Sequence, residues 1–210
     1  MKYDGLRHLG AVAAQLRERA GNPRAANGGP LPSLILVTDT LRHPDPLRAM
    51  RCLPRGSAVL LRDYEHAQRA SLAAALAREC SALGIALWVG ADLALARSVA
   101  ADGLHLRERD VGLLSREQWH GVLTTSVHSL GALERASRLA ADAALIAPVF
   151  ATRTHPDARP IGVKRLREMV REAEMPVYAL GGINLSNASR LLDTGVAGVA
   201  AVDALHGAAR

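Results

Sequence analysis

The chain has 210 residues, of which 49% are hydrophobic, so it has the size and composition of one folded domain with a buried core. Its formal net charge is +6, but only 3% of its residues are aromatic, which argues against the clustered basic and aromatic surfaces of nucleic-acid-binding proteins. The sequence has neither an apolar run of about 18 residues nor a secretory signal, so we expect a cytoplasmic protein without a membrane span, in which Cys52 and Cys80 are reduced.

Residues 1–33 form a unit that precedes the regular part of the chain. Apolar residues recur at helical spacing over Leu6–Arg19, which predicts an amphipathic helix. A linker rich in glycine, proline and asparagine follows from Gly21 to Pro32. We expect the helix to cap the bottom of the main domain or to join a partner, and a homodimer is one such arrangement.

Residues 34–210 contain eight short apolar runs that alternate with longer amphipathic segments. The runs are Leu34–Val37, Ala58–Leu61, Ile85–Val89, Gly103–Leu106, Val122–Ser126, Ala143–Ala147, Val177–Leu180 and Gly198–Val202. Such runs are typical of parallel strands that are covered on both faces, and the segments between them suit crossover helices, for example Glu65–Ala82, Leu130–Ala141 and Ser186–Leu192. The pattern predicts a single-domain (β/α)₈ TIM barrel; an open doubly wound sheet is the alternative, because a strand count does not show closure.

Two loops near the C-terminus have the composition of a phosphate site. Gly181 and Gly182 follow the seventh run, Val202 ends the eighth, and Asp203 comes directly after it. In these barrels the loops after strands seven and eight commonly bind phosphate. Adjacent glycines let the backbone approach an anion closely, and a helix that starts behind them adds a favourable dipole. The alternative is that the glycines only make a tight turn, but the match of both loops favours a phosphate site.

The loop after the sixth run extends the same interpretation. The hydroxyls of Thr152 and Thr154 can donate hydrogen bonds to phosphate oxygens, and Arg153 or His155 would add positive charge. The alternative is a solvated loop that is shaped by its prolines. A loop of this length in a small barrel is more often functional.

Three further polar residues lie at or near predicted strand ends. His128 follows the fifth run and could transfer a proton near neutral pH, although capping of the next helix is the simpler interpretation. We expect His105, at the end of the fourth run, to be a packed residue. Asp110 could ligate a cation, but a lone aspartate is usually a surface group.

Together these motifs resemble the thiamine-phosphate synthase and thiazole tautomerase family. The motifs that carry the resemblance are Ser126-Val-His128-Ser, Ala147-Pro-Val-Phe150 with Thr152 and Thr154, Pro176-Val-Tyr-Ala-Leu-Gly-Gly-Ile-Asn184 and Gly195–Val202. The resemblance extends more loosely over residues 34–105. It implies a barrel enzyme of thiamine biosynthesis that joins a thiazole phosphate to a hydroxymethylpyrimidine diphosphate and expels diphosphate with the help of Mg²⁺.

The resemblance also implies roles for individual residues. The thiazole phosphate would be held by Thr152, Thr154, Gly182 and the backbone of Val202 and Asp203. The diphosphate would be faced by Arg62 and Ser126, and Asp110 would be a Mg²⁺ ligand.

The chain departs from the synthase pattern in the half of the site that would hold the diphosphate. Leu60 and Tyr64 replace a glutamine and a lysine of that pattern, and His155 replaces a second lysine. Trp88-Val89 replaces an Asn-Asp pair, so one expected Mg²⁺ ligand is missing. Three functions therefore stay open: a divergent synthase, which we place first, a thiazole tautomerase that uses His128 for proton transfer, and a non-catalytic relative that binds a phosphorylated ligand.

Overall fold

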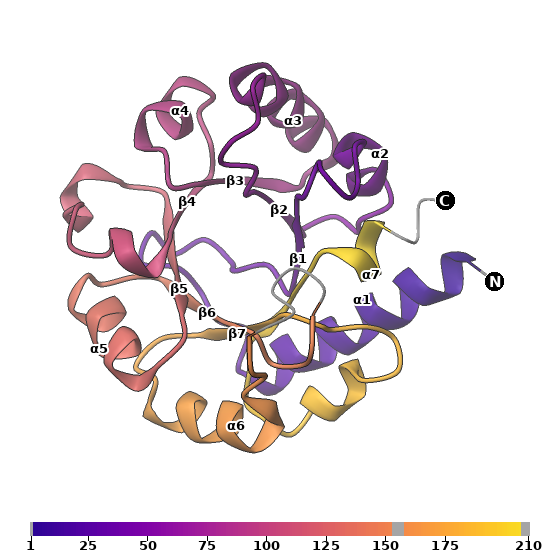
Figure 1. The fold of residues 1–210 in the computed structure, drawn as a ribbon, viewed down its shortest axis with the longest axis vertical. Coiled ribbons are helices and arrows are strands. Elements are labelled where there is room, and N and C mark those ends of the chain that lie inside the picture. Colours follow the sequence, from indigo (N-terminus) through magenta and orange to yellow (C-terminus); the bar gives the residue numbers. More distant parts are fainter. Residues whose placement is uncertain (1, 153–157, 207–210) are drawn as a thin grey trace.

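The computed structural model describes residues 2–152 and 158–206, in which eight parallel strands close into a barrel (Figure 1). Each strand pairs with the next one along the chain, and β8 pairs with β1. The strands are β1 Leu34–Val37, β2 Ala58–Leu61, β3 Ala86–Gly90, β4 Gly103–Leu106, β5 Val122–Val127, β6 Ala143–Ile146, β7 Val177–Leu180 and β8 Gly198–Ala201. The predicted (β/α)₈ barrel is therefore confirmed, and the open sheet is excluded.

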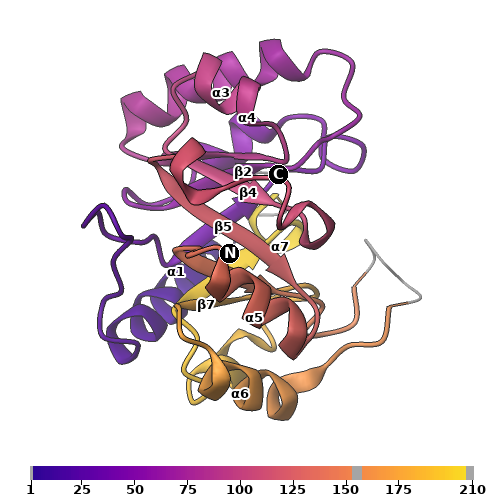
Figure 2. The ribbon, with the colours of Figure 1, turned by 90° about the vertical axis from the view of Figure 1, so that its left-hand side faces the viewer.

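Helices surround the barrel, as Figures 1 and 2 show from two directions. The α-helices are α1 Lys2–Arg19, α2 Pro46–Met50, α3 Arg69–Leu83, α4 Leu93–Ser98, α5 Leu130–Arg138, α6 Gly162–Glu172 and α7 Asp203–His206, and the 3₁₀ turns are η1 Glu108–Asp110, η2 Arg116–Gln118 and η3 Ala188–Leu191. Between β4 and β5 the connection consists of η1 and η2 instead of an α-helix. Among the described helices, none combines the length and the apolarity needed to cross a membrane.

The segment after β7 differs from the expected helix over Ser186–Leu192. It forms only the 3₁₀ turn η3, and the side chain of Asn184 makes a local turn just before it. The Asn184 Oδ1 atom accepts hydrogen bonds from the Ser186 N–H at 2.9 Å and from the Ser186 hydroxyl at 2.6 Å. The dipole that we expected behind the two glycines is correspondingly small, so a ligand there would depend on local N–H groups.

The buried side chains form two layers, as the alternation of a strand requires. In β1, Ile35 and Val37 point into the barrel, whereas Leu34 and Leu36 point towards the helices. Trp88 is the largest side chain in the interior layer. Gly103 leaves room for its ring, since a Cβ atom there would lie 2.3 Å from the Trp88 Cδ1 atom. The interior is therefore a packed core, and the open space lies above it.

Helix α1 lies on the outer side of the barrel beside β8 and β1 (Figure 1). Its apolar face, with Leu9, Val12 and Leu16, is buried in the layer between strands and helices. The expectation that this helix caps the bottom of the barrel was therefore wrong. The amphipathic pattern of α1 fits this position, because a helix that packs on the outer face of the barrel needs one continuous apolar stripe.

The linker, rather than helix α1, closes the bottom of the barrel. Ala25 and Leu31 belong to the interior layer. The Tyr178 hydroxyl donates a hydrogen bond to the Pro32 carbonyl at 2.5 Å. The Ala26 N–H donates to the Asp142 carboxylate at 2.6 Å. The linker thus seals the N-terminal ends of the strands and leaves the opposite end open.

Candidate functional site

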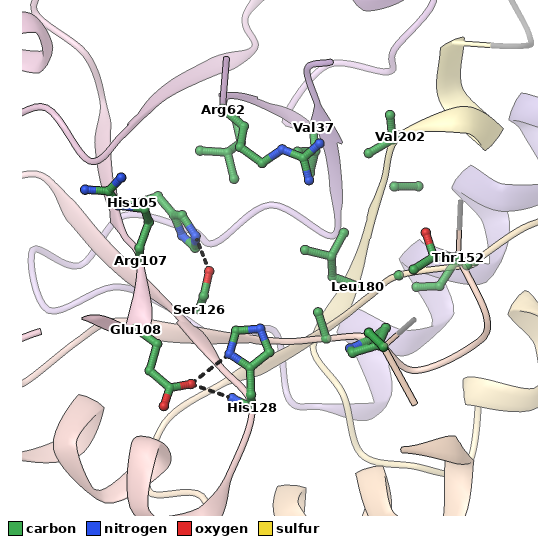
Figure 3. A pocket seen from close by; sticks show the side chains of 18 of the residues that line it. Val37, Arg62, His105, Arg107, Glu108, Ser126, His128, Thr152, Leu180 and Val202 are labelled. Atoms are coloured by element: carbon green, nitrogen blue, oxygen red, sulfur yellow. Dashed lines mark hydrogen bonds and ion pairs between the residues drawn. The ribbon is translucent and has the colours of Figure 1, made fainter. Parts of the chain in front are cut away.

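A cavity of about 590 Å³ opens at the C-terminal end of the barrel. The predicted site residues that line it are Arg62, Ser126, His128, Thr152, Gly181, Gly182, Val202 and Asp203. Asp110 is outside this lining, and Thr154 and His155 lie outside the described residues. Figure 3 shows Ser126 and His128 across the cavity from Thr152 and Val202, with the Arg62 guanidinium beside Val37. The barrel therefore brings together residues that are far apart in the sequence.

The two glycines after β7 lie directly against the loop that follows β6. Gly182 has a φ of +66°, and a Cβ atom there would lie 2.2 Å from the Ala151 carbonyl oxygen. Gly181 has a φ of +94°, and its Cβ atom would lie 2.8 Å from the Pro148 Cα atom. The Phe150 N–H donates a hydrogen bond to the Gly181 carbonyl at 3.0 Å. In a planar trans peptide the Gly182 N–H points the opposite way, away from that bond.

The Asp203 carboxylate at the start of α7 is turned towards the loop after β1. It accepts hydrogen bonds from Arg42 at 2.9 Å and lies 2.8 Å from the His43 Nε2 atom. Burial alone would raise the pKa of Asp203, but the hydrogen bond from His43 and the charge of Arg42 lower it. Its negative charge is thus partly compensated by Arg42, which also pairs with Asp39.

Arg62 is held in place at the end of β2 by two neighbours. Its side chain donates a hydrogen bond to Asp39 at 3.1 Å, and its N–H donates to the Thr38 hydroxyl at 3.0 Å. Asp63 accepts hydrogen bonds from the hydroxyls of Thr38 and Thr40. Burial would raise the pKa of Asp63, yet these hydrogen bonds lower it overall. This network orients the Arg62 guanidinium towards the cavity (Figure 3).

His105 supports Ser126 from below, in agreement with its predicted role as a packed residue. It is 2% exposed, its Nδ1 atom lies 2.9 Å from the Thr124 hydroxyl, and its Nε2 atom lies 2.9 Å from the Ser126 hydroxyl (Figure 3). Burial, with a smaller contribution from the charge of Arg62, lowers the pKa of His105 to about 3. The imidazole is therefore neutral at physiological pH and positions Ser126.

His128 is held by a carboxylate that sequence reasoning did not single out. The Glu108 Oε2 atom lies 2.7 Å from the His128 Nδ1 atom and accepts a hydrogen bond from the His128 N–H at 3.0 Å (Figure 3). The other oxygen of Glu108 accepts from Arg135 at 2.8 Å. A carboxylate at Nδ1 makes the Nε2 atom the available base, a common arrangement for proton transfer. The sequence feature that could have identified Glu108 is its position just beyond the end of β4.

Tyr64, Arg107 and Asp110 form a packed group beside this half of the cavity. The Arg107 guanidinium lies 5.1 Å from the centre of the Tyr64 ring. It donates hydrogen bonds to both oxygens of Asp110, at 2.5 and 3.0 Å. Burial raises the pKa of Tyr64 although the nearby arginines oppose this shift. The phenol is therefore neutral and serves as a stacking surface.

The residues at this place do not fit a Mg²⁺ site. Magnesium requires several oxygen ligands, usually carboxylates and water. Val89 offers no side-chain oxygen, and both oxygens of Asp110 face the Arg107 guanidinium. Within residues 2–152 and 158–206, no three His, Cys, Asp or Glu side chains gather in a way that could hold a metal ion.

Comparison with known proteins yields one consistent result. A family model described as thiamine monophosphate synthase matches residues 34–205. The thiamine-phosphate synthase of Syntrophomonas wolfei subsp. wolfei is 34% identical over 189 residues, covering 84% of this chain and 89% of the relative. A putative thiamine-phosphate synthase 2 of Aquifex aeolicus is 30% identical, covering 82% of this chain and 96% of the relative. The solved thiamine phosphate pyrophosphorylase of Pyrococcus furiosus superposes with a TM-score of 0.69 at 26% identity, covering 85% of this chain and 92% of that chain.

Proposed function

The chain belongs to the thiamine-phosphate synthase family, and we propose that its cavity binds a thiazole phosphate and couples it to a hydroxymethylpyrimidine diphosphate. In this reaction the thiazole ring nitrogen bonds to the methylene carbon of the pyrimidine as the bond between that carbon and the diphosphate oxygen breaks. The observation that carries the proposal is the meeting of the loops after β6, β7 and β8 at one side of the cavity. We place the activity in the cytoplasm, in keeping with Cys52 and Cys80, neither of which is in a disulfide.

The backbone of the late loops supports binding of the thiazole phosphate. Gly182 has no side chain, so its N–H can approach a phosphate oxygen closely. Thr152 lines the same side of the cavity and offers a hydroxyl. The N–H of Asp203 begins a helical turn beside them, and the charge of its carboxylate is compensated by Arg42. We expect Thr154 and His155 to contribute as well, although they lie outside the described residues.

The opposite side of the cavity would receive the pyrimidine diphosphate. Arg62 supplies a guanidinium that is oriented by Asp39, and Ser126 supplies a hydroxyl that is fixed by the buried His105. The lining also contains apolar surface from Val37 and Leu180, which suits the faces of two heteroaromatic rings. The cavity thus offers separate polar groups at two ends and an apolar middle.

The proposal is tested by mixing the protein with both substrates and measuring thiamine phosphate in a coupled assay. The expected result is product formation, and Thr152→Ala should raise the KM for the thiazole phosphate. Arg138→Ala serves as a matched control, because this arginine is 77% exposed on α5 and outside the cavity lining. Absence of product with and without Mg²⁺ would eliminate the synthase proposal. If calorimetry detects no binding of thiazole phosphate, this compound is excluded as the ligand of the cavity.

The geometry of His128 favours one second candidate, a thiazole tautomerase. Glu108 fixes the imidazole so that Nε2 is the available base at the cavity wall. In this function His128 would remove a proton from the thiazole phosphate and return one at another position. His128→Ala should abolish exchange of that proton for deuterium, as followed by NMR, and Glu108→Gln should slow it about tenfold or more. Unchanged exchange in His128→Ala would rule out the tautomerase. Binding without either reaction would identify a non-catalytic relative.

A further inference from the structure

Three arginines line the same half of the cavity as Ser126 and His128. They are Arg62 after β2 and Arg107 and Arg109 after β4. Arg107 and Arg69 both lie over the Tyr64 ring, at 5.1 and 5.8 Å from its centre. Arg62 and Arg107 are each paired with a carboxylate, Asp39 and Asp110, so this half presents oriented guanidinium groups on an aromatic support, which suit an anion that brings several oxygens.

Arg107 is fixed more firmly than an ordinary surface arginine. Its Nε and Nη2 atoms donate to the two oxygens of Asp110 at 2.5 and 3.0 Å, and the Asp110 side chain is only 15% exposed. Tyr64 covers the face of the same guanidinium. The hydrogen bonds to Asp110 raise the pKa of Arg107, so the group keeps its charge. A guanidinium that is held along one edge and one face presents its remaining N–H groups in a defined direction.

A divalent cation and this arginine compete for the same carboxylate. A cation bound to Asp110 would stand next to the Arg107 guanidinium, and the two positive charges would repel each other. To admit the cation, Arg107 would have to leave both Asp110 and Tyr64. Val89, at the end of the neighbouring β3, is buried and offers no oxygen to compensate. The side chains therefore favour a resident guanidinium over a metal ion.

We propose that Arg107, clamped by Asp110 and Tyr64, replaces a divalent cation, so that this half of the cavity binds a phosphoanion of the diphosphate class without Mg²⁺. The inference rests on the proposed function for the identity of the cavity and adds how its second ligand is recognised. Asp110 acts as the positioning residue that orients Arg107. Arg62, just after β2, provides the second guanidinium of the cavity lining.

Calorimetric titration with inorganic diphosphate tests this proposal on the full chain. The dissociation constant should agree within about twofold between a buffer with Mg²⁺ and a buffer with EDTA. Arg107→Ala should weaken binding about tenfold or more in both buffers, whereas the exposed Arg138→Ala should leave it unchanged. Binding that requires Mg²⁺, wild-type affinity in Arg107→Ala, or no binding in either buffer would overturn the proposal.

Asp110→Asn separates the two roles of this carboxylate. Asparagine keeps the size and one hydrogen-bond acceptor for Arg107 but removes the negative charge next to the anion site. If Asp110 orients an arginine, diphosphate affinity in EDTA should be kept or increased. A loss of about tenfold or more that is seen only in the buffer with Mg²⁺ would contradict the proposal, because it is the result expected of a metal ligand. Titration of the same samples with thiazole phosphate reports on the loops after β6, β7 and β8 alone. A failure of the proposed function is therefore distinguished from a failure of the proposal for Arg107.

Discussion

Replacement of Gly182 by alanine perturbs the proposed phosphate site at its most constrained point. The new Cβ atom would lie 2.2 Å from the Ala151 carbonyl oxygen and 2.8 Å from the Phe150 carbonyl oxygen. The φ of +66° alone costs an alanine about 1–2 kcal/mol, and relief of the overlap costs about 1–3 kcal/mol more. We therefore expect the free energy of unfolding to fall by about 2–5 kcal/mol. The loop after β7 must also move away from the loop after β6, which displaces the Gly182 N–H.

Urea unfolding and calorimetry with thiazole phosphate measure the two effects separately. Binding should weaken about tenfold or more, which corresponds to about 1.4 kcal/mol. Gly28→Ala is the matched control: its φ is +79°, but a Cβ atom there meets no other atom within 4 Å. That variant should lose only about 1–2 kcal/mol of stability and bind normally. Wild-type affinity in Gly182→Ala would refute the assignment of this loop to the phosphate.

Two further residues give stability predictions. His105 is neutral when folded, with a pKa of about 3, but in the unfolded chain it protonates near the ordinary histidine pKa of 6.5. The unfolded state thus binds more protons between these values, so the free energy of unfolding decreases as the pH is lowered, by about 1.4 kcal/mol per pH unit. In urea unfolding, the free energy of unfolding of the wild type should decrease between pH 7 and pH 5 by about 2 kcal/mol more than that of His105→Gln. Equal decreases in the two proteins would contradict this prediction. Asp142→Ala should cost about 3–5 kcal/mol in the same assay, because Arg116 and the Leu123 N–H lose a buried acceptor; a loss below about 1 kcal/mol would contradict the role of Asp142.

The strand pattern was predictable because each strand of this barrel is buried on both faces. Leu34–Val37, Ala58–Leu61, Gly103–Leu106 and Val177–Leu180 have the bounds that were expected from the apolar runs alone. Helix ends were less predictable, since they depend on local caps. The turn made by Asn184 is an example, because an Asx turn and a helix start have the same residue preferences.

Other features were not predictable because they depend on contacts between distant segments. An amphipathic pattern at Leu6–Arg19 shows that one face is buried but not against which surface, so the place of α1 beside β8 had to come from the structure. Likewise, Glu108 and His128 are 20 residues apart, and only the pairing of β4 with β5 brings them together. The strand-end positions indicated the candidate site, whereas its pairings needed the fold.

A crystal structure of the chain with bound thiazole phosphate tests the central claim most directly. We predict that phosphate oxygens lie within about 3.2 Å of the backbone nitrogens of Gly182 and Asp203, with Thr152 beside them. A phosphate bound instead beside Arg62 and Arg107, on the opposite side of the cavity, would contradict the account.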